Sequence, residues 1–585
     1  MKRPALLILC ALIVAANTSS VRGDDRPNVL VILTDDQGWG DLRVSGNTNL
    51  STPNIDSLAR DGTTFRHFYV CQVCAPTRAE FLTGRYYPKT GVSGVSTGQE
   101  RLNVDETTIA NLFQAAGYAT GAFGKWHNGT QSPYHPLDRG FDQFYGFTSG
   151  HWGHYFSPPL DHNGRTVRGN GFIVDDVTDH AIEFIRENLT RPFFCYVPLN
   201  TPHSPMMVPD RFYEKFDGAE MEMKHRDPER EDVMMTRAAL ALCENIDWNV
   251  GRLLQTVRDA NLQDDTIVIY FSDNGPNSFR WNGGMKGRKG SIDEGGLRVP
   301  GFIRWPGRIP AGRVVEPIAA AIDLLPTLST LCGVTDRASR TRDGADLSTL
   351  LSGRVDTAPD RLLFSIKNHQ VSVRNQRFRL DADGKLFDIA NDPGQETDVS
   401  ANHRRIAKDL LDRATEHGED MQRFFERFSD RPFTVGYGPS TTLPARDGVP
   451  HGGIRRSSKA PNNSFFTAWK DERGSVTWDI EVGESAEYEV IANCTCSAGN
   501  EGVTLRLGVD GGPSTESVVG QVFDPPLYDK SKERVEESHY FVKDFRPLSL
   551  GVLRLDAGRS MIRLTAKNLQ GSGVVDVHSL VLRRK

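Results

Sequence analysis

The sequence predicts an α/β fold with a wound, mixed or parallel sheet flanked by helices, then a small antiparallel subdomain and a β-sandwich. Three observations predict this architecture. Continuous apolar runs alternate with helical patterns in the first half of the chain, as they do in wound sheets. Short strands follow one another from about residue 361. After about residue 464, strands of period two are separated by glycine-rich turns, which is typical of a β-sandwich.

Three apolar runs in the first half are continuous, as expected for parallel strands that are buried on both faces. They span residues 28–33, 193–199 and 266–271. Asp35-Asp36 follows the first run, and Asp273-Asn274 follows the third. Because ligands bind at the carboxyl ends of strands in wound sheets, we expect a site at this edge. Helices are predicted from Thr52-Pro53 to Gly62, over 107–116 and over 234–260.

The second half divides by composition and periodicity. An amphipathic helix with Ile406, Leu410 and Phe424 on its apolar face completes the small subdomain. A stretch rich in Gly, Pro, Ser and Asn follows and is interpreted as a linker. The final sandwich resembles carbohydrate-binding modules, with a structural cap as the alternative. The predicted divisions are a signal peptide at 1–23, an α/β domain at 24–355, its C-terminal subdomain at 356–436, a linker at 437–463 and a β-sandwich at 464–585.

Composition limits the class of protein. The chain has 585 residues, which at roughly 150 residues per domain indicates two to four domains. Its 69 basic and 75 acidic residues give a net charge of -6, which argues against a partner nucleic acid. With 25% charged and 38% hydrophobic residues, the bulk of the chain is neither disordered nor membrane-embedded.

The N-terminus indicates export to the periplasm or the extracellular space. Residues 1–23 have the pattern of a signal peptide, with Lys2 and Arg3 before an apolar run. The run is shorter than the ~20 residues of a spanning helix, so we expect no membrane span after cleavage; an uncleaved anchor is the alternative. Cleavage removes Cys10 and leaves seven of the eight cysteines. This odd number requires at least one unpaired or modified thiol in an oxidising compartment.

The most specific motif is Cys74-Ala75-Pro76-Thr77-Arg78, which is followed by Leu82-Thr83-Gly84-Arg85. Further motifs follow along the chain. They are Gly124-Lys125-Trp126-His127, Thr201-Pro202-His203, Asp273-Asn274-Gly275, and Lys289-Gly290-Ser291 before Glu294-Gly295-Gly296. In this order they resemble the type I, formylglycine-dependent sulfatases of the alkaline phosphatase superfamily. The resemblance extends from residue 27 to about residue 430, and the tail beyond about residue 445 lies outside it.

The resemblance implies that Cys74 is oxidised to formylglycine (3-oxoalanine) by a formylglycine-generating or sulfatase-maturing enzyme. One hydroxyl of the hydrated aldehyde then attacks sulfur, and the second allows an elimination that expels sulfate. Residue 74 is expected to begin a helix, whose N-terminus favours an anion. Conversion of Cys74 also leaves an even number of thiols in the mature chain. How the other cysteines pair stays open.

A metal site is implied at the same place. The expected ligands supply oxygen atoms, which suits a hard cation such as Ca²⁺. The sequence does not distinguish Ca²⁺ from Mg²⁺ or Mn²⁺. Carboxylates that converge without a cation would repel each other. Such acidic pairs also begin helices and turns, and that is the alternative. The expected metal ligands are Asp35, Asp36, Asp273, Asn274 and the modified Cys74.

The resemblance also assigns catalytic roles. Arg78 and Lys125 are expected to hold the hydrate. Asp273 is the expected base for the attacking hydroxyl, and His127 is expected to take a proton during sulfate release. His203 and Lys289 are expected to bind sulfate, with His203 protonating the leaving alcohol. Lys286 is the alternative to Lys289.

The substrate class follows less directly. Lys125, His203 and Lys289 are the expected sulfate contacts. Aromatic and cationic side chains at His151, Trp152, His154 and Arg280 are predicted to line a sugar subsite, with a packed loop as the alternative. The sequence therefore predicts a secreted sulfatase acting on sulfated glycans. A phosphonate or phosphate ester hydrolase of the same superfamily, and a glycan-binding protein with an idle catalytic domain, are the competing hypotheses.

Overall fold

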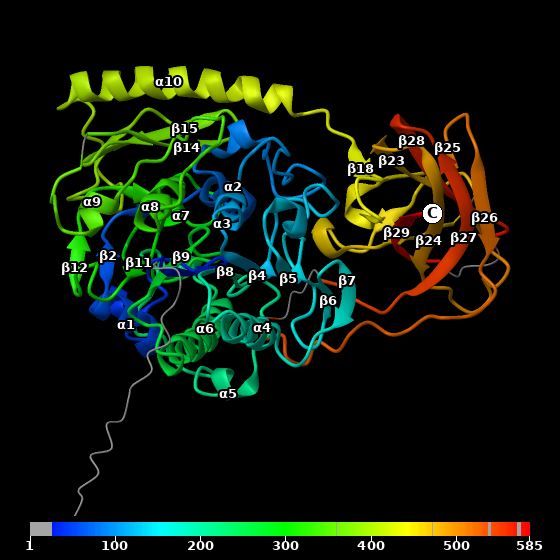
Figure 1. Ribbon diagram of the computed structural model, residues 1–585, viewed down its shortest axis with the longest axis horizontal. Coiled ribbons are helices and arrows are strands. Elements are labelled where there is room, and N and C mark those ends of the chain that lie inside the picture. The colour runs from blue at the N-terminus through cyan, green and yellow to red at the C-terminus, as the bar shows by residue number, and fades with distance from the viewer. Residues whose placement is uncertain (1–25, 359, 471, 536–539, 570–574) are drawn as a thin grey trace, which may run out of the picture.

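The computed structural model describes residues 26–358, 360–470, 472–535, 540–569 and 575–585. The predicted signal peptide lies outside these residues. The α/β domain and the sandwich lie side by side, and the long helix α10 runs along the α/β domain (Figure 1). Across the described ranges, no helix combines the length and the apolar character needed to cross a bilayer.

The α/β domain is built on one mixed sheet of ten strands in the order β12-β2-β11-β9-β1-β8-β4-β5-β6-β7. The central strands β9, β1, β8, β4 and β5 run parallel, and β11, β6 and β7 are antiparallel to their neighbours. This confirms the predicted wound sheet. The strands are β1 (Asn28–Thr34), β2 (Thr63–Phe65), β4 (Ala119–Lys125), β5 (Gln143–Phe147), β6 (Pro159–His162), β7 (Arg165–Arg168), β8 (Phe193–Pro198), β9 (Thr266–Ser272), β11 (Gly301–Arg304) and β12 (Arg313–Val315).

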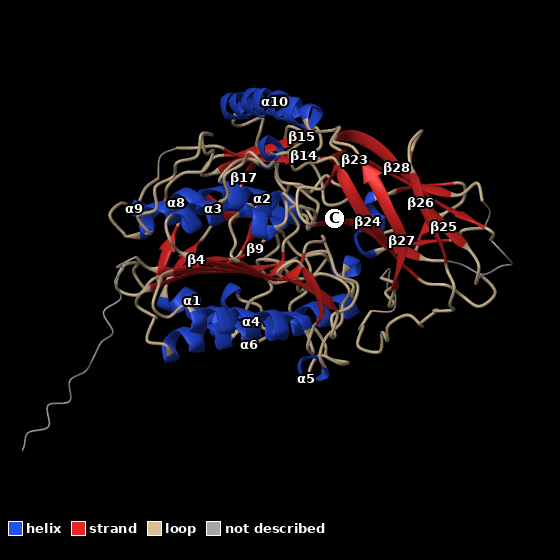
Figure 2. Ribbon diagram, turned by 45° about the vertical axis from the view of Figure 1, so that its right-hand side comes forward, coloured by secondary structure: helices blue, strands red, loops and turns tan. Residues whose placement is uncertain are grey.

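Helices cover both faces of this sheet (Figure 2). On one face lie α1 (Pro53–Asp61), α4 (Ile173–Glu187) and α6 (Val233–Asp259), and on the other lie α2 (Cys74–Thr83), α3 (Ile109–Ala115) and α8 (Leu324–Leu331). Helix α1 has the expected Pro at its first turn and ends at Gly62. Short helices complete the domain: α5 (Asp210–Tyr213), α7 (Glu294–Leu297) and α9 (Ser348–Leu351).

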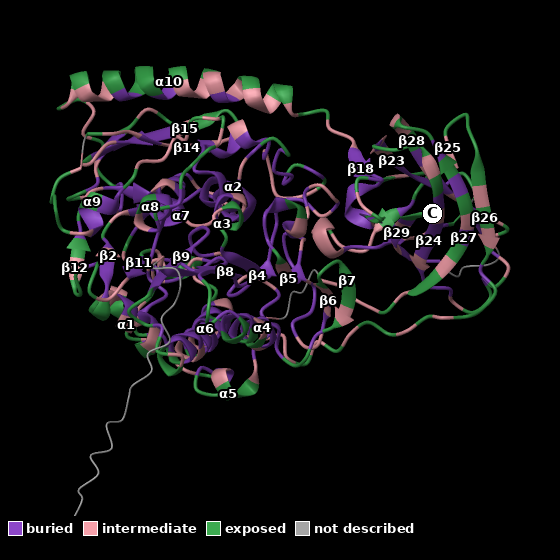
Figure 3. Cartoon of the chain, viewed as in Figure 1, coloured by how far each residue is buried: buried purple, intermediate pink, exposed green. Residues whose placement is uncertain are grey.

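Two small sheets and a long helix follow. A three-stranded sheet contains β10 (Arg298–Val299), β3 (Phe68–Tyr69) and β13 (Ala319–Ala320). The predicted antiparallel subdomain contains β14 (Leu363–Lys367), β15 (Gln370–Arg374), β16 (Phe378–Leu380) and β17 (Leu386–Asp388). Helix α10 (Arg404–Arg427) packs on it through Leu410, Ala414 and Met421, while its outer face is exposed (Figure 3).

The C-terminal part forms two six-stranded sheets around a separate hydrophobic core. One contains β18 (Phe433–Val435), β20 (Val449–His451), β23 (Ser475–Val482), β25 (Thr504–Val509), β26 (Ser514–Val518) and β28 (Gly558–Lys567). The other contains β19 (Ser440–Pro444), β21 (Arg455–Arg456), β22 (Phe466–Thr467), β24 (Ala486–Cys494), β27 (Arg546–Leu555) and β29 (Val577–Arg584).

The predicted linker at 437–463 is wrong. Strand β19 pairs with the last strand β29, and β20 pairs with β23, so this stretch belongs to the sandwich. Its glycines and prolines separate short edge strands, which lack the length needed for a clear period of two.

Candidate active site

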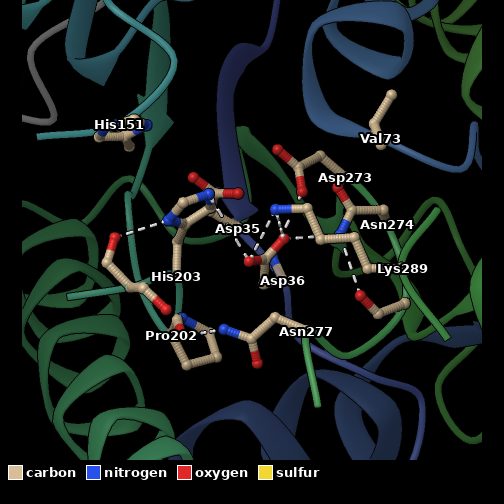
Figure 4. A network of polar contacts seen from close by, with 12 residues as sticks. Asp35, Asp36, Val73, His151, Pro202, His203, Asp273, Asn274, Asn277 and Lys289 are labelled. Atoms are coloured by element: carbon tan, nitrogen blue, oxygen red, sulfur yellow. Dashed lines mark hydrogen bonds and ion pairs between the residues drawn. The ribbon is translucent and has the colours of Figure 1, made fainter. Parts of the chain in front are cut away.

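Carboxylates meet at the carboxyl ends of β1 and β9, as their position in the sequence predicted. Thr34 pairs with Ser272 in the parallel register, so the residues that follow them lie side by side. The Asp273 amide donates a hydrogen bond to the Thr34 carbonyl at 3.0 Å. Asp36 has a φ of 68°, a left-handed conformation that costs about 1–3 kcal/mol for a residue other than glycine. Figure 4 shows Asp35, Asp36, Asp273 and Asn274 gathered at this edge.

The cluster fits a hard cation. Ligand atoms of Asp35, Asp36 and His203 all lie within 4.8 Å of one another, as do those of Asp35, Cys74 and Asp273. Oδ1 of Asp35 and Oδ1 of Asn274 are buried without a hydrogen-bond partner, which a bound cation would provide. Burial and the neighbouring Asp35 carboxylate raise the pKa of Asp273 above its ordinary value. This shift is the expected cost of converging carboxylates without a metal ion.

Cys74 is the first residue of α2 and lies beside this cluster. Its residue exposure is 3%, and burial raises the pKa of its thiol. A protonated thiol is a weak nucleophile, so the unmodified side chain is poorly suited to attack. All seven cysteines among the described residues are buried and unpaired, including Cys494 and Cys496.

Two fully buried cations connect the elements around the cluster. The Arg78 guanidinium donates to Oδ2 of Asp273 at 2.8 and 3.1 Å, and its Nη1 donates to the Lys125 carbonyl at 2.6 Å. Nζ of Lys125 lies 2.5 Å from Oδ2 of Asp35. These contacts join α2, β4, β1 and β9 at one point, which fixes the geometry of the site.

Lys289 and His203 lie on the accessible side of the site. Nζ of Lys289 is 2.6 Å from Oδ1 of Asp36, and Nε2 of His203 is 3.8 Å from Oδ2 of the same residue (Figure 4). Their side chains are 21% and 12% exposed, whereas the side chains of Asp35, Asp36 and Arg78 are at most 1% exposed. Lys286, the alternative lysine, instead pairs with Asp293 at 3.2 Å.

Backbone carbonyls fix the tautomers of two histidines. Nε2 of His127 lies 2.8 Å from the Val95 carbonyl and must donate to it, which leaves a lone pair on its buried Nδ1. Burial and Lys125 hold the pKa of His127 well below its ordinary value, so the ring is neutral. Nδ1 of His203 donates to the Ser204 carbonyl at 2.7 Å, so its Nε2 is the atom directed at the site.

Comparisons with known proteins decide the family. The sulfatase family model matches residues 27–334, more than half of the chain. The chain belongs to the sulfatase family. It is therefore a sulfuric ester hydrolase of the alkaline phosphatase-like superfamily, as the motifs predicted.

Relatives of this sulfatase agree with the assignment. N-acetylgalactosamine-6-sulfatase of Canis lupus familiaris is 31% identical over 382 residues, covering 59% of this chain and 70% of that protein. Arylsulfatase D of Homo sapiens is 29% identical over 458 residues, covering 62% of this chain and 74% of that protein. The crystal structure of Ps i-CgsB in complex with k-i-k-neocarrahexaose superposes with a TM-score of 0.62 at 27% identity, covering 69% of this chain and 98% of that one.

The residues predicted to line a sugar subsite of this sulfatase have different environments in the structure. Arg280 is 1% exposed and donates to both carboxylate oxygens of Asp41 at 2.8 and 2.7 Å. Its burial contradicts the expected contact with substrate. The ring nitrogens of His154 each lie 2.9 Å from a backbone carbonyl, those of Phe156 and Asp529, so neither is free for a ligand.

The other two members of that set differ from each other. Trp152 stacks on Phe147 at 5.1 Å, which is a packing role. His151 lies 6.0 Å from the His203 ring and is the member of the set that the structure brings to the site. The packed-loop alternative therefore describes Trp152 and His154, and the subsite prediction is retained for His151.

Two residues of the site were not expected from the sequence, and a third has another role than the sequence suggested. Tyr155 lies in the aromatic stretch considered for a sugar subsite, but its hydroxyl shares its proton between the carbonyls of His203 and Ser204 at 2.9 and 3.0 Å and supports the histidine. Asn462 and Tyr540 of the sandwich also reach the site. Neither lies in a motif, and each is far from the catalytic motifs in the sequence, so only the folded chain brings them there.

Proposed function

We propose that this sulfatase is exported and removes sulfate from sulfated glycans, with a formylglycine made from Cys74 and a bound Ca²⁺. One observation carries the proposal. Cys74 begins a helix beside the three buried carboxylates of Asp35, Asp36 and Asp273, and cationic side chains surround them. Buried oxygen atoms of Asp35 and of the neighbouring Asn274 have no hydrogen-bond partner. The carboxylates suit a cation, and the cations suit a sulfate ester.

The residues that would hold the cation are Asp35, Asp36, Asp273 and Asn274, together with residue 74. A formylglycine supplies a hydrated oxygen nucleophile that accepts the sulfuryl group and later releases sulfate without hydrolysis at sulfur. Arg78 and Lys125 would orient the hydrate at residue 74, and the buried contacts of Arg78 with the Lys125 carbonyl and of Lys125 with the Asp35 carboxylate hold both cations in place. Nδ1 of His127 carries the lone pair that accepts a proton during release.

On the accessible side, His203 in its doubly protonated form would keep Nδ1–H on the Ser204 carbonyl and protonate the oxygen of the leaving alcohol from Nε2. Lys289 binds sulfate oxygens. Nζ of Lys289 lies on the Asp36 carboxylate. A cation on that carboxylate would compete with the ammonium group and free it for the anionic substrate. With metal and sulfate both bound, each of the two groups would exchange its present partner for another of opposite charge.

Support for a glycan substrate comes from the relatives. The similar solved structure is a complex with a neocarrahexaose, and the curated relatives include N-acetylgalactosamine-6-sulfatases. An ester hydrolase for phosphate or phosphonate would use the same pocket and is the competing activity. Rates on p-nitrophenyl sulfate, a panel of sulfated saccharides and a phosphodiester separate the two, and a large phosphodiester preference would contradict the proposal.

Modification of residue 74 has its own test. Mass spectrometry of the peptide containing residue 74, taken from protein made in the native host, should show the aldehyde in place of the thiol. A peptide that retains the unmodified thiol in active enzyme would contradict the mechanism, whatever the substrate.

A further inference from the structure

The sandwich extends an arm onto the α/β domain next to the His203 segment. We define the arm as residues 527–535 and 540–545, between β26 and β27. Met207 and Glu533 form an antiparallel bridge, and the Val208 amide donates to the Lys532 carbonyl at 3.1 Å. The arm is therefore held by an isolated β-bridge at Met207, four residues after His203, so a displacement of the arm would also move the segment that carries His203.

A second segment of the sandwich, the turn at Asn462, contacts the catalytic histidine indirectly. Nδ2 of Asn462 lies 3.4 Å from the Val95 carbonyl, the same oxygen that accepts from Nε2 of His127. It also lies 3.4 Å from Nδ1 of His151. A Cβ on Gly150 would lie 2.4 Å from both Asn462 Nδ2 and His127 Nε2, so glycine is required for this approach.

Aromatic rings connect the arm to the accessible side of the site. The Tyr540 ring lies 4.7 Å from the His151 ring at 66°, and the His151 ring lies 6.0 Å from the His203 ring at 16°. Burial raises the pKa of Tyr540 to about 12, so its hydroxyl is neutral in the working range. The three rings form a row from the sandwich to the residue expected to protonate the leaving alcohol.

The exposure of the site shows where a substrate enters. His203 and Lys289 are the most accessible of the side chains around the carboxylates, while Cys74 and Lys125 are buried. The group that carries the sulfate must therefore lie on the His203 side, beside the ring row. Aromatic faces together with an amide that can hydrogen-bond suit a sugar ring with its hydroxyls.

We propose that Tyr540 and Asn462 form a wall of the pocket that binds the sugar ring bearing the sulfate, so that the sandwich sets substrate selectivity. This inference rests on the proposed function. It gives the sandwich a role in the active site itself, in contrast to a module that binds polysaccharide at a distance.

The test compares full-length variants on p-nitrophenyl sulfate and on a panel of sulfated mono- and disaccharides. For Tyr540→Ala and Asn462→Ala we expect kcat/KM on the preferred saccharide to fall at least tenfold, mainly through KM, and to fall several times less on the aryl sulfate, which has no sugar ring to contact. Tyr540→Phe keeps the ring and should retain most activity. Tyr528→Ala is the matched control, because Tyr528 lies on the same arm but contacts Arg168 at 2.8 Å.

Three results would overturn the inference. If Tyr540→Ala leaves saccharide turnover unchanged, Tyr540 does not contribute to binding the sugar ring. Equal losses on both substrates, or equal losses in Tyr528→Ala, indicate that the arm matters only for folding. A wild-type enzyme that is active on p-nitrophenyl sulfate but on no saccharide contradicts both the role of Tyr540 and Asn462 and the assignment of a glycan substrate. Inactivity on every sulfate ester contradicts the proposed function itself.

Discussion

Arg280 provides a sharp test of how the site is built. Its guanidinium binds the Asp41 carboxylate through two contacts, and Nη2 also donates to the Asp36 carbonyl at 2.9 Å. Asp36 is the expected metal ligand with a left-handed backbone, which persists only when its surroundings hold it. We therefore interpret Arg280 as a positioning residue that holds Asp36 in place.

The Arg280→Met variant measures this role. Arg280 and Asp41 are each 1% exposed, and breaking a buried ion pair costs about 3–5 kcal/mol because one charge stays uncompensated. At about 2 °C per kcal/mol for a large domain, the melting temperature should fall by about 6–10 °C. Displacement of Asp36 should lower kcat by about 100-fold, because a misplacement of about 1 Å can have that effect.

A double variant separates the two effects. Asp41→Leu with Arg280→Met replaces the buried pair by apolar side chains, which is often close to neutral for stability. We expect the melting temperature to recover by at least half, while kcat stays low because the Asp36 carbonyl still lacks its donor. Thermal melts with and without Ca²⁺ and steady-state kinetics provide the readouts. An unchanged melting temperature in Arg280→Met together with a raised KM would refute this reasoning and restore Arg280 as a substrate contact.

The remaining predictions concern the nucleophile, the metal, the two candidate sulfate-binding lysines and a remote histidine. Cys74→Ala should abolish turnover with an unchanged melting temperature, and Cys74→Ser should be active only where the maturing enzyme accepts serine. EDTA should inactivate the enzyme and added Ca²⁺ should restore its activity; free Ca²⁺ at 100 times its Kd should raise the free energy of unfolding by about 2.7 kcal/mol. In steady-state assays Lys289→Ala should lower kcat/KM more than 100-fold, whereas Lys286→Ala should lower it less than threefold. His417 stacks on Phe364 at 4.0 Å, and burial lowers its pKa to about 4. Because a histidine in the unfolded chain has a pKa near 6.5, the contribution of His417 to the free energy of unfolding should fall as the pH falls from 6.5 to 4, by up to about 3 kcal/mol. Over that pH range the melting temperature of His417→Phe should fall less than that of the control His369→Gln, in which an exposed histidine is replaced. Equal falls in the two variants would contradict this assignment.

The chemistry at the sheet edge was predictable because it depends on local pattern. Asp35 and Asp273 each follow an apolar run, and the parallel register brings them together without further information. Cys74 at the start of a helix was predictable for the same reason. The role of Arg280 was not, because a cation in an aromatic stretch is compatible with both a ligand and a buried partner. Only the position of Asp41 across the fold distinguishes them.

The sandwich shows a different limit. Its strands were predicted from their period of two, but its relation to the site depends on contacts between distant segments, such as Asn462 with Val95. Lys532 pairs with Asp210 at 2.5 Å, and Arg534 also pairs with Asp210, beside the backbone bridge at Met207. Exposed pairs of this kind contribute little alone, but they add to backbone hydrogen bonds that fix the arm. Since the arm is fixed next to His203, loosening the sandwich should change catalysis before it unfolds the α/β domain, which a tethered binding module would not do.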